Sequence, residues 1–157
     1  MKKILLLVLC AILALSFVGC DSDEKSDALL EYMNEDMNEI AELEDAFNAI
    51  YNSDACTYES LSTEGAEAFK KFSEKATEVA NGIEDEKIKD VHKIYVSYVE
   101  KKGAALEALT EYYKDNTFED AKVDEANKCL DEAEELFDKY DLELKTLMSE
   151  YGVEYKD

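Results

Sequence analysis

The sequence predicts an all-α protein that folds as an up-down-up-down antiparallel four-helix bundle after removal of an N-terminal leader. Apolar residues recur at alternating steps of three and four along most of the chain, which is typical of amphipathic helices packed lengthwise. Proline is absent from all 157 residues, as suits long uninterrupted helices. The joins between the periodic segments are short, and short joins force neighbouring helices to run antiparallel.

Residues 1–19 have the order of parts of an export signal. Lys2 and Lys3 precede an apolar run over residues 4–18, and the small residue Gly19 follows. The run is about 15 residues long, whereas a helix needs roughly 20 to span a bilayer. We therefore predict a cleaved leader, and Cys10 is lost with it.

The residues around the predicted cleavage point are Phe17-Val18-Gly19-Cys20, and acidic residues follow at once. This stretch resembles the lipobox of bacterial lipoproteins, although Phe17 stands where that family usually has leucine. The resemblance implies that the chain is cut before Cys20 and that the Cys20 thiol carries a diacylglyceryl group. An ordinary secretory signal is the alternative. Because two acyl chains hold a protein stably in a membrane, we expect an anchor on the extracytoplasmic face of the cell membrane.

The predicted mature chain divides into a short polar tether, residues 20–26, and an acidic helical domain, residues 27–157. At about 3.3 Å per extended residue, the tether keeps the start of the domain within roughly 25 Å of the bilayer. Loss of Lys2 and Lys3 changes the formal net charge from −22 to −24. So acidic a surface repels nucleic acids and anionic lipid headgroups, which leaves the lipid on Cys20 to hold the protein at the membrane.

The periodicity divides the domain into helices over residues 27–52, 58–81, 85–114 and 118–151. We predict Asp85 as the N-cap of the third helix, Asn81-Gly82 as a left-handed stop and Gly152 as the end of the fourth. Lys102 falls on the apolar face of the third helix, where its alkyl stem can snorkel to the surface. The fourth helix has the clearest apolar seam, formed by Val123, Ala126, Leu130, Ala133, Phe137, Tyr140, Leu144, Leu147 and Tyr151.

The last two predicted helices contain the stretches IKDVHKIYVSYVEKKGAALEAL and DEANKCLDEAEELFDKYDLELKTLMSEYGVE. Their spacing is similar to that of an extracytoplasmic four-helix domain in lipoproteins of low-GC Gram-positive bacteria. That resemblance implies the fold and the location, and it implies no catalytic role.

The residue sets that build catalytic or metal centres are missing from the sequence. His92 is the only histidine, and Lys89 stands three residues before it, so a di-iron site or a His-Glu-x-x-His zinc site cannot be assembled. We expect His92 on a helix flank. Neither a Gly-x-Ser-x-Gly elbow nor a glycine-rich phosphate loop occurs. We predict no enzymatic activity, no metal and no cofactor.

The other cysteines, Cys56 and Cys129, leave two alternatives open. A pair of cysteines outside the cytoplasm invites a disulfide. The predicted helix lengths, however, place Cys129 roughly 8 to 10 Å beyond the level of Cys56, which is further than a bridge spans. Without a bridge, Cys129 is a small packing residue beside Leu130.

Ten tyrosines form the last group of candidate site residues. Tyr95, Tyr98 and Tyr140 are candidates for an inter-helix groove, although tyrosines at this spacing more often pack in a core. We predict a non-enzymatic binding or adaptor lipoprotein whose acidic helical surface binds another envelope protein or a peptide. The alternative is a receptor for a small ligand or a cation that uses an inter-helix cavity or the acidic faces.

Overall fold

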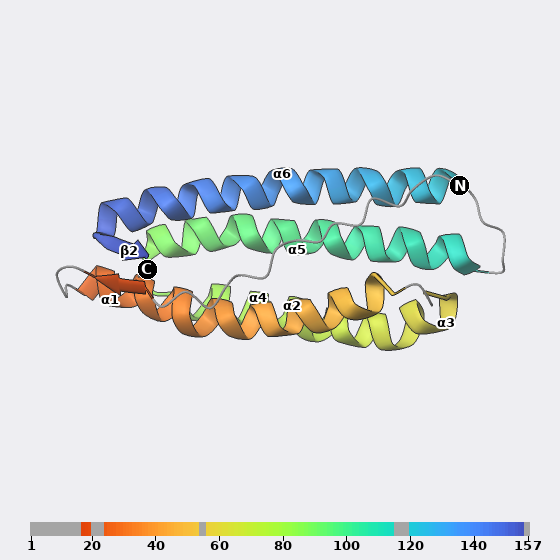
Figure 1. Ribbon diagram of the computed structural model, residues 1–157, viewed down its shortest axis with the longest axis horizontal. Helices are drawn as coiled ribbons and strands as arrows, with labels where there is room; N and C mark the ends of the chain where they lie inside the picture. The colour runs from red at the N-terminus through yellow and green to blue at the C-terminus, as the bar shows by residue number, and fades with distance from the viewer. Residues whose placement is uncertain (1–16, 20–23, 54–55, 115–119, 156–157) are drawn as a thin grey trace.

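The computed structural model describes residues 17–19, 24–53, 56–114 and 120–155. Figure 1 shows the predicted bundle, in which four long helical segments run in alternating directions. The first segment comprises α1 (Glu24–Glu31), η1 (Tyr32–Asp36) and α2 (Met37–Tyr51). The second comprises α3 (Tyr58–Ser60), η2 (Leu61–Gly65) and α4 (Ala66–Gly82). The last two segments are α5 (Glu86–Tyr113) and α6 (Asp120–Tyr151).

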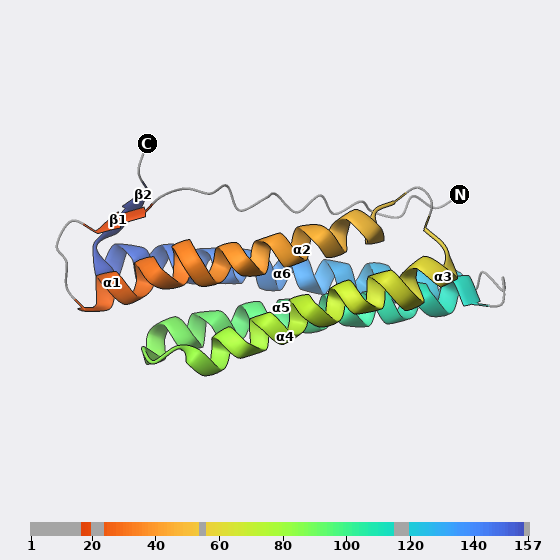
Figure 2. The same cartoon turned by 90° about the horizontal axis from the view of Figure 1, so that it is seen from below.

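The four segments pack in a closed ring. α2 packs on α4, α4 on α5 and α5 on α6, while α1 returns to contact α6. The view in Figure 2 shows α1 and α2 on one side of α6 and α4 beside α5. The first and third segments are therefore diagonal partners that face each other across the centre of the bundle.

The ends of the helices follow local side-chain chemistry. Asp85 caps α5 by accepting hydrogen bonds from the backbone N–H groups of Lys87 (2.9 Å) and Ile88 (3.0 Å), which confirms the predicted cap. Gly152, at a φ of +66°, ends α6 as predicted, because glycine adopts this left-handed conformation without a steric cost. The prediction for Gly82 is wrong: α4 ends when Ile83 becomes extended, and Gly152 is the glycine with positive φ among the described residues.

Two π-helical turns interrupt the first and second segments. η1 and η2 each follow a short stretch of α-helix, and each contributes buried residues to the core. The first segment also begins at Glu24, earlier than predicted, because its first turns already bury Ser26 and Leu29. A π turn widens the helix locally and changes the direction of its side chains, and such turns occur frequently at functional sites.

A two-stranded antiparallel sheet lies at the end of the bundle where α1 begins and α6 ends (Figure 2). β1 (Phe17–Gly19) pairs with β2 (Val153–Tyr155), and the register places Phe17 against Tyr155, Val18 against Glu154 and Gly19 against Val153. The all-α prediction did not include this sheet, because a strand of three residues is too short for an alternating pattern to be recognised. β1 lies wholly within the predicted leader.

Candidate functional site

A buried carboxylate lies at the centre of the bundle. Glu44 of α2 is 7% exposed, and its oxygens accept hydrogen bonds from the hydroxyls of Tyr95 (2.8 Å) and Tyr98 and from Lys102 Nζ (2.7 Å), all on α5. Lys102, also 7% exposed, donates a further hydrogen bond to Asn48 Oδ1 at 2.9 Å. The charges are thus paired inside the core, as buried charges must be. Lys102 is not the snorkelling lysine that the sequence predicted.

A second polar chain lies next to this cluster. His92 of α5 is 0% exposed; its Nε2 contacts the Ala76 carbonyl oxygen at 2.8 Å and its Nδ1 contacts the Tyr32 hydroxyl at 3.0 Å. A carbonyl only accepts, so Nε2 carries the proton and the Tyr32 hydroxyl donates to Nδ1. The Tyr140 hydroxyl, 3.0 Å from that of Tyr32, then donates to it. The expectation that His92 lies on a helix flank is wrong.

Burial determines the protonation of both clusters. Desolvation lowers the pKa of His92, and its hydrogen bond to the Ala76 carbonyl opposes this only in part, so the ring is neutral near pH 7. Burial and then the nearby Glu44 carboxylate hold the pKa of Tyr95 and of Tyr98 well above the usual range. These tyrosines therefore stay protonated and act as hydrogen-bond donors.

The tyrosines proposed for a groove lie in the core. Tyr95, Tyr98 and Tyr140 are buried, their hydroxyls are engaged by Glu44 and Tyr32, and their rings pack together with a Tyr95–Tyr140 centroid distance of 5.1 Å. This is the packing alternative, and these three residues leave no groove open between them.

The predicted cysteine sites have different outcomes. Cys20 lies outside the described residues, so its lipidation stays a prediction. Cys56 and Cys129 are both free thiols and half-buried, and both lie close enough to the buried Tyr51 hydroxyl to raise its pKa further after desolvation. Burial also raises the pKa of Cys56, which makes its thiol a poor nucleophile at neutral pH.

A groove opens at the end of the bundle where α1 begins and α4 ends. Its cavity volume is about 450 Å³, which falls in the range of small-ligand and side-chain sites. The groove is lined by Ala28, Glu31, Tyr32, Asp36, Lys75, Glu78, Val79, Gly82, Ile83, Glu84, Asp85 and Ile88. Apolar side chains form part of the lining, five acids supply negative charge, and Lys75 is the lysine among the lining residues.

The charge of the groove is only partly compensated. Lys75 Nζ lies 2.6 Å from a carboxylate oxygen of Glu39 and 3.4 Å from one of Glu78. Desolvation raises the pKa of Asp36; Lys75 opposes the rise, and the charges of neighbouring glutamates add to it. Within the described residues, neither Glu31 nor Glu84 forms an ion pair with a lysine. A positive group placed in the groove would therefore relieve an existing excess of negative charge.

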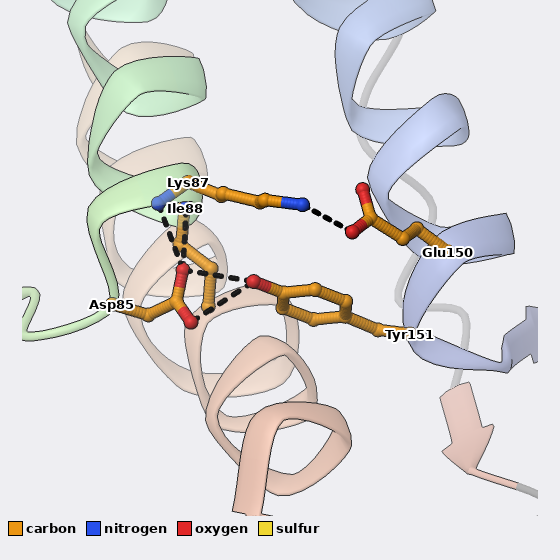
Figure 3. Close-up of polar contacts among 5 residues, drawn as sticks. All are labelled: Asp85, Lys87, Ile88, Glu150 and Tyr151. Carbon is orange, nitrogen blue, oxygen red and sulfur yellow. Dashed lines mark hydrogen bonds and ion pairs between the residues drawn. The ribbon is translucent and has the colours of Figure 1, made fainter.

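Asp85 links this groove to the C-terminal strand. Figure 3 shows Tyr151 reaching from α6 to the start of α5, where its hydroxyl donates to the two carboxylate oxygens of Asp85 at 3.0 and 2.9 Å, while Lys87 pairs with Glu150 beside it. Burial alone would raise the pKa of Asp85, but the hydrogen bonds from Ile88, Tyr151 and Lys87 outweigh it and lower that pKa. Asp85 thus stays ionised at neutral pH.

Two further features are absent from the described part of the chain. No group of three or more histidine, cysteine, aspartate or glutamate side chains is arranged to hold a metal ion in those residues. None of the helices that the structure describes is both long and apolar enough to span a bilayer.

Neither the acid at the centre of the bundle nor the groove was predicted from the sequence. Glu44 lies on the inner face of the first segment, four residues after Ile40 and three before Phe47, at a position where an apolar residue is expected. Lys102 on an apolar face was the available signal, because a buried cation requires a buried anion. For the groove no signal exists in the sequence, since it depends on how two helix ends diverge.

The chain was compared with models of known protein families, with curated proteins and with solved structures. None of the three comparisons gave a match. The fold and the groove themselves define the class: a four-helix bundle with an acidic, partly apolar groove at one end.

We expect the Glu44–Lys102 pair to contribute far more to stability than a surface pair. Glu44→Gln leaves the ammonium group of Lys102 buried without its counter-ion, so the free energy of unfolding should fall by about 3 kcal/mol or more. Urea denaturation measures the change. Asp141→Asn, which breaks the exposed Asp141–Lys145 pair, should cost less than about 0.5 kcal/mol. Adding Lys102→Met to Glu44→Gln should recover much of the lost stability. Equal losses of stability in Glu44→Gln and Asp141→Asn would contradict a central role for the Glu44–Lys102 pair.

The buried neutral His92 predicts a pH dependence of stability. Its pKa is lowered in the folded state, so its contribution is fully present above the unfolded pKa of about 6.5 and is lost as the pH falls toward the folded value. Between pH 7.5 and 5.5, denaturation should show the wild type losing more stability than His92→Gln, by up to about 1.4 kcal/mol per pH unit below 6.5. Carboxylates titrate alike in both proteins, so parallel pH profiles would show that His92 does not titrate on unfolding.

Proposed function

We propose that this protein is a membrane-anchored, extracytoplasmic binding lipoprotein without catalytic activity, which binds a positively charged segment of another envelope protein or peptide in its acidic groove. The observation that carries the proposal is the groove at the end of the bundle, where an apolar lining adjoins an excess of carboxylates. The apolar lining suits the alkyl stem of a lysine or arginine, and the carboxylates suit its charged head.

The proposed anchor would place the groove close to the membrane. Ala28 and Glu31 line it from α1, the helix that begins at Glu24. A lipid on Cys20 is only four residues before this helix in the sequence, so the groove would face a partner at or near the membrane surface. An anchored partner meets such a site at a high local concentration.

A receptor for a small organic cation is the second candidate function. The cavity volume of about 450 Å³ is large enough to enclose one, and the same carboxylates would neutralise it. A bare metal ion receives no such support, because the described residues contain no group of three potential ligands.

The anchor predicts a defined mass for the protein extracted from membranes. Intact mass spectrometry should show loss of residues 1–19 and addition of a diacylglyceryl group at Cys20. Cys20→Ala should retain its leader and carry no lipid. An unlipidated protein released into the medium would refute the anchor and leave the groove as the site of a secreted protein.

If the groove binds the partner, removing negative charge from the groove should abolish partner binding, whereas removing the same charge elsewhere should not. Glu31→Gln with Glu84→Gln should lose a partner that cross-links to the wild type in solubilised envelopes, because both acids line the groove. Glu107→Gln with Glu135→Gln changes the net charge equally at exposed sites outside it, and should retain that partner. Equal loss in both double variants would indicate attraction by net charge alone. Loss only in the first variant, with tight calorimetric binding of 1,5-diaminopentane, would favour the small-cation receptor.

A further inference from the structure

β2 is fixed to the bundle by residues outside β1. Gly152 turns the chain out of α6, and Val153 is 3% exposed within the hydrophobic core. Just before this turn, the Tyr151 hydroxyl donates to both oxygens of Asp85, and Lys25 Nζ lies 5.6 Å from the centroid of the Tyr151 ring. α1 and α6 both contact β2, so the bundle as well as β1 positions this strand.

The strand that covers one edge of β2 belongs to the segment that our proposed function removes. Cleavage before Cys20 takes away the whole of β1, Phe17–Gly19. The N–H and C=O groups of β2 that face β1 then lose their partners. An exposed strand edge of this kind is a template for another extended chain.

We propose that this edge of β2 in the mature protein binds an extended segment of another polypeptide as an antiparallel strand, in the place that β1 occupies before cleavage. The inference rests on the proposed function for the cleavage itself. It adds the binding mode: the partner contributes a strand to the sheet beside the groove.

The charge of the strand indicates the chemistry of the partner. Glu154 is exposed at the middle of β2, and the register places Val18 of β1 opposite it. A lysine or arginine at that position would form a favourable cross-strand pair. A second copy of this chain fits poorly, because antiparallel pairing of two β2 strands about their centres sets one Glu154 against the other, and like charges opposite each other destabilise a sheet.

Asp85 and α1 connect β2 to the groove. Asp85 lines the groove and also holds Tyr151, two residues before β2 begins. α1 lines the groove with Ala28 and Glu31 and also contacts β2. Three residues of sheet bind weakly alone, so a partner that also places a basic side chain in the groove would gain from both contacts.

Peptide titration followed by NMR tests the inference. Among the residues whose burial the structure describes, the hydrophobic core extends from Leu29 to Val153, and a chain of residues 20–157 contains all of these. The probe is a synthetic peptide that copies residues 14–19 with Val18→Lys. In detergent micelles, we expect it to shift the amide signals of residues 153–155 in the mature chain. The uncleaved Cys20→Ala chain, whose own β1 occupies the edge, should show no such shifts.

Charge swapping provides the matched control. The peptide with Val18→Lys should bind the mature chain roughly two- to fivefold more tightly than the unaltered peptide, given the usual strength of a cross-strand charge pair. Glu154→Lys in the mature chain should reverse that preference without unfolding the bundle, since Glu154 is exposed.

Three results would overturn the inference. They are equal amide shifts in the cleaved and uncleaved chains, no shifts at residues 153–155, and a concentration-dependent dimer of the mature chain joined through β2. Intact mass spectrometry keeps this separate from the proposed function. If the protein is cleaved and lipidated but the peptide does not shift the amide signals of residues 153–155, the strand site alone is refuted. An uncleaved protein in the membrane would refute both the strand site and the proposed lipid anchor.

Discussion

The fold depends on satisfying one carboxylate that is buried at the centre of the bundle. Glu44 lies on the first helical segment, and its partners Tyr95, Tyr98 and Lys102 lie on the third. These segments are diagonal in the bundle, and long side chains join them across its centre. Because a buried charge without its partner costs several kcal/mol, the pairing of Glu44 with its partners selects one axial register of the two segments. The Tyr32–His92 contact, which joins the same two segments, fixes that position a second time.

The apolar side chains alone would not select one arrangement so strictly. Heptad cores tolerate shifts by a turn, since one apolar side chain replaces another with little loss. Polar groups inside the core remove that tolerance, as a buried asparagine does in coiled coils. Here His92 also reaches the Ala76 carbonyl of α4, and Tyr140 of α6 reaches Tyr32. Hydrogen bonds of buried side chains thus join all four segments.

Features that depend on residues close together in the sequence were predicted, and features that depend on residues far apart in the sequence were not. Helix number, direction and most boundaries depend on periodicity and caps within a few residues, and the Asp85 cap and Gly152 stop were readable for that reason. The prediction for His92 was wrong because the helical period does not show which groups of other segments lie opposite a residue. Its hydrogen-bond partners, Tyr32 and the Ala76 carbonyl, belong to the first and second segments. The β1–β2 pair joins opposite ends of the chain, and the groove depends on helix divergence at η1 and α4, so neither has a local signature. The lipid anchor is the reverse case, with a sequence signature at Cys20 that the described residues do not test.

The Asp85–Tyr151 contact has a mechanical consequence. The start of α1 and the end of α6 lie at the same end of the bundle, so a pull between the proposed anchor on Cys20 and the proposed partner on β2 would act across that end and not along the helices. Such a load tends to peel α1 from α6 one turn at a time instead of shearing whole helices past each other. The hydrogen bonds from Tyr151 to Asp85 transfer part of that load to α5, and the resistance of the domain to force would be set by these few contacts near the membrane.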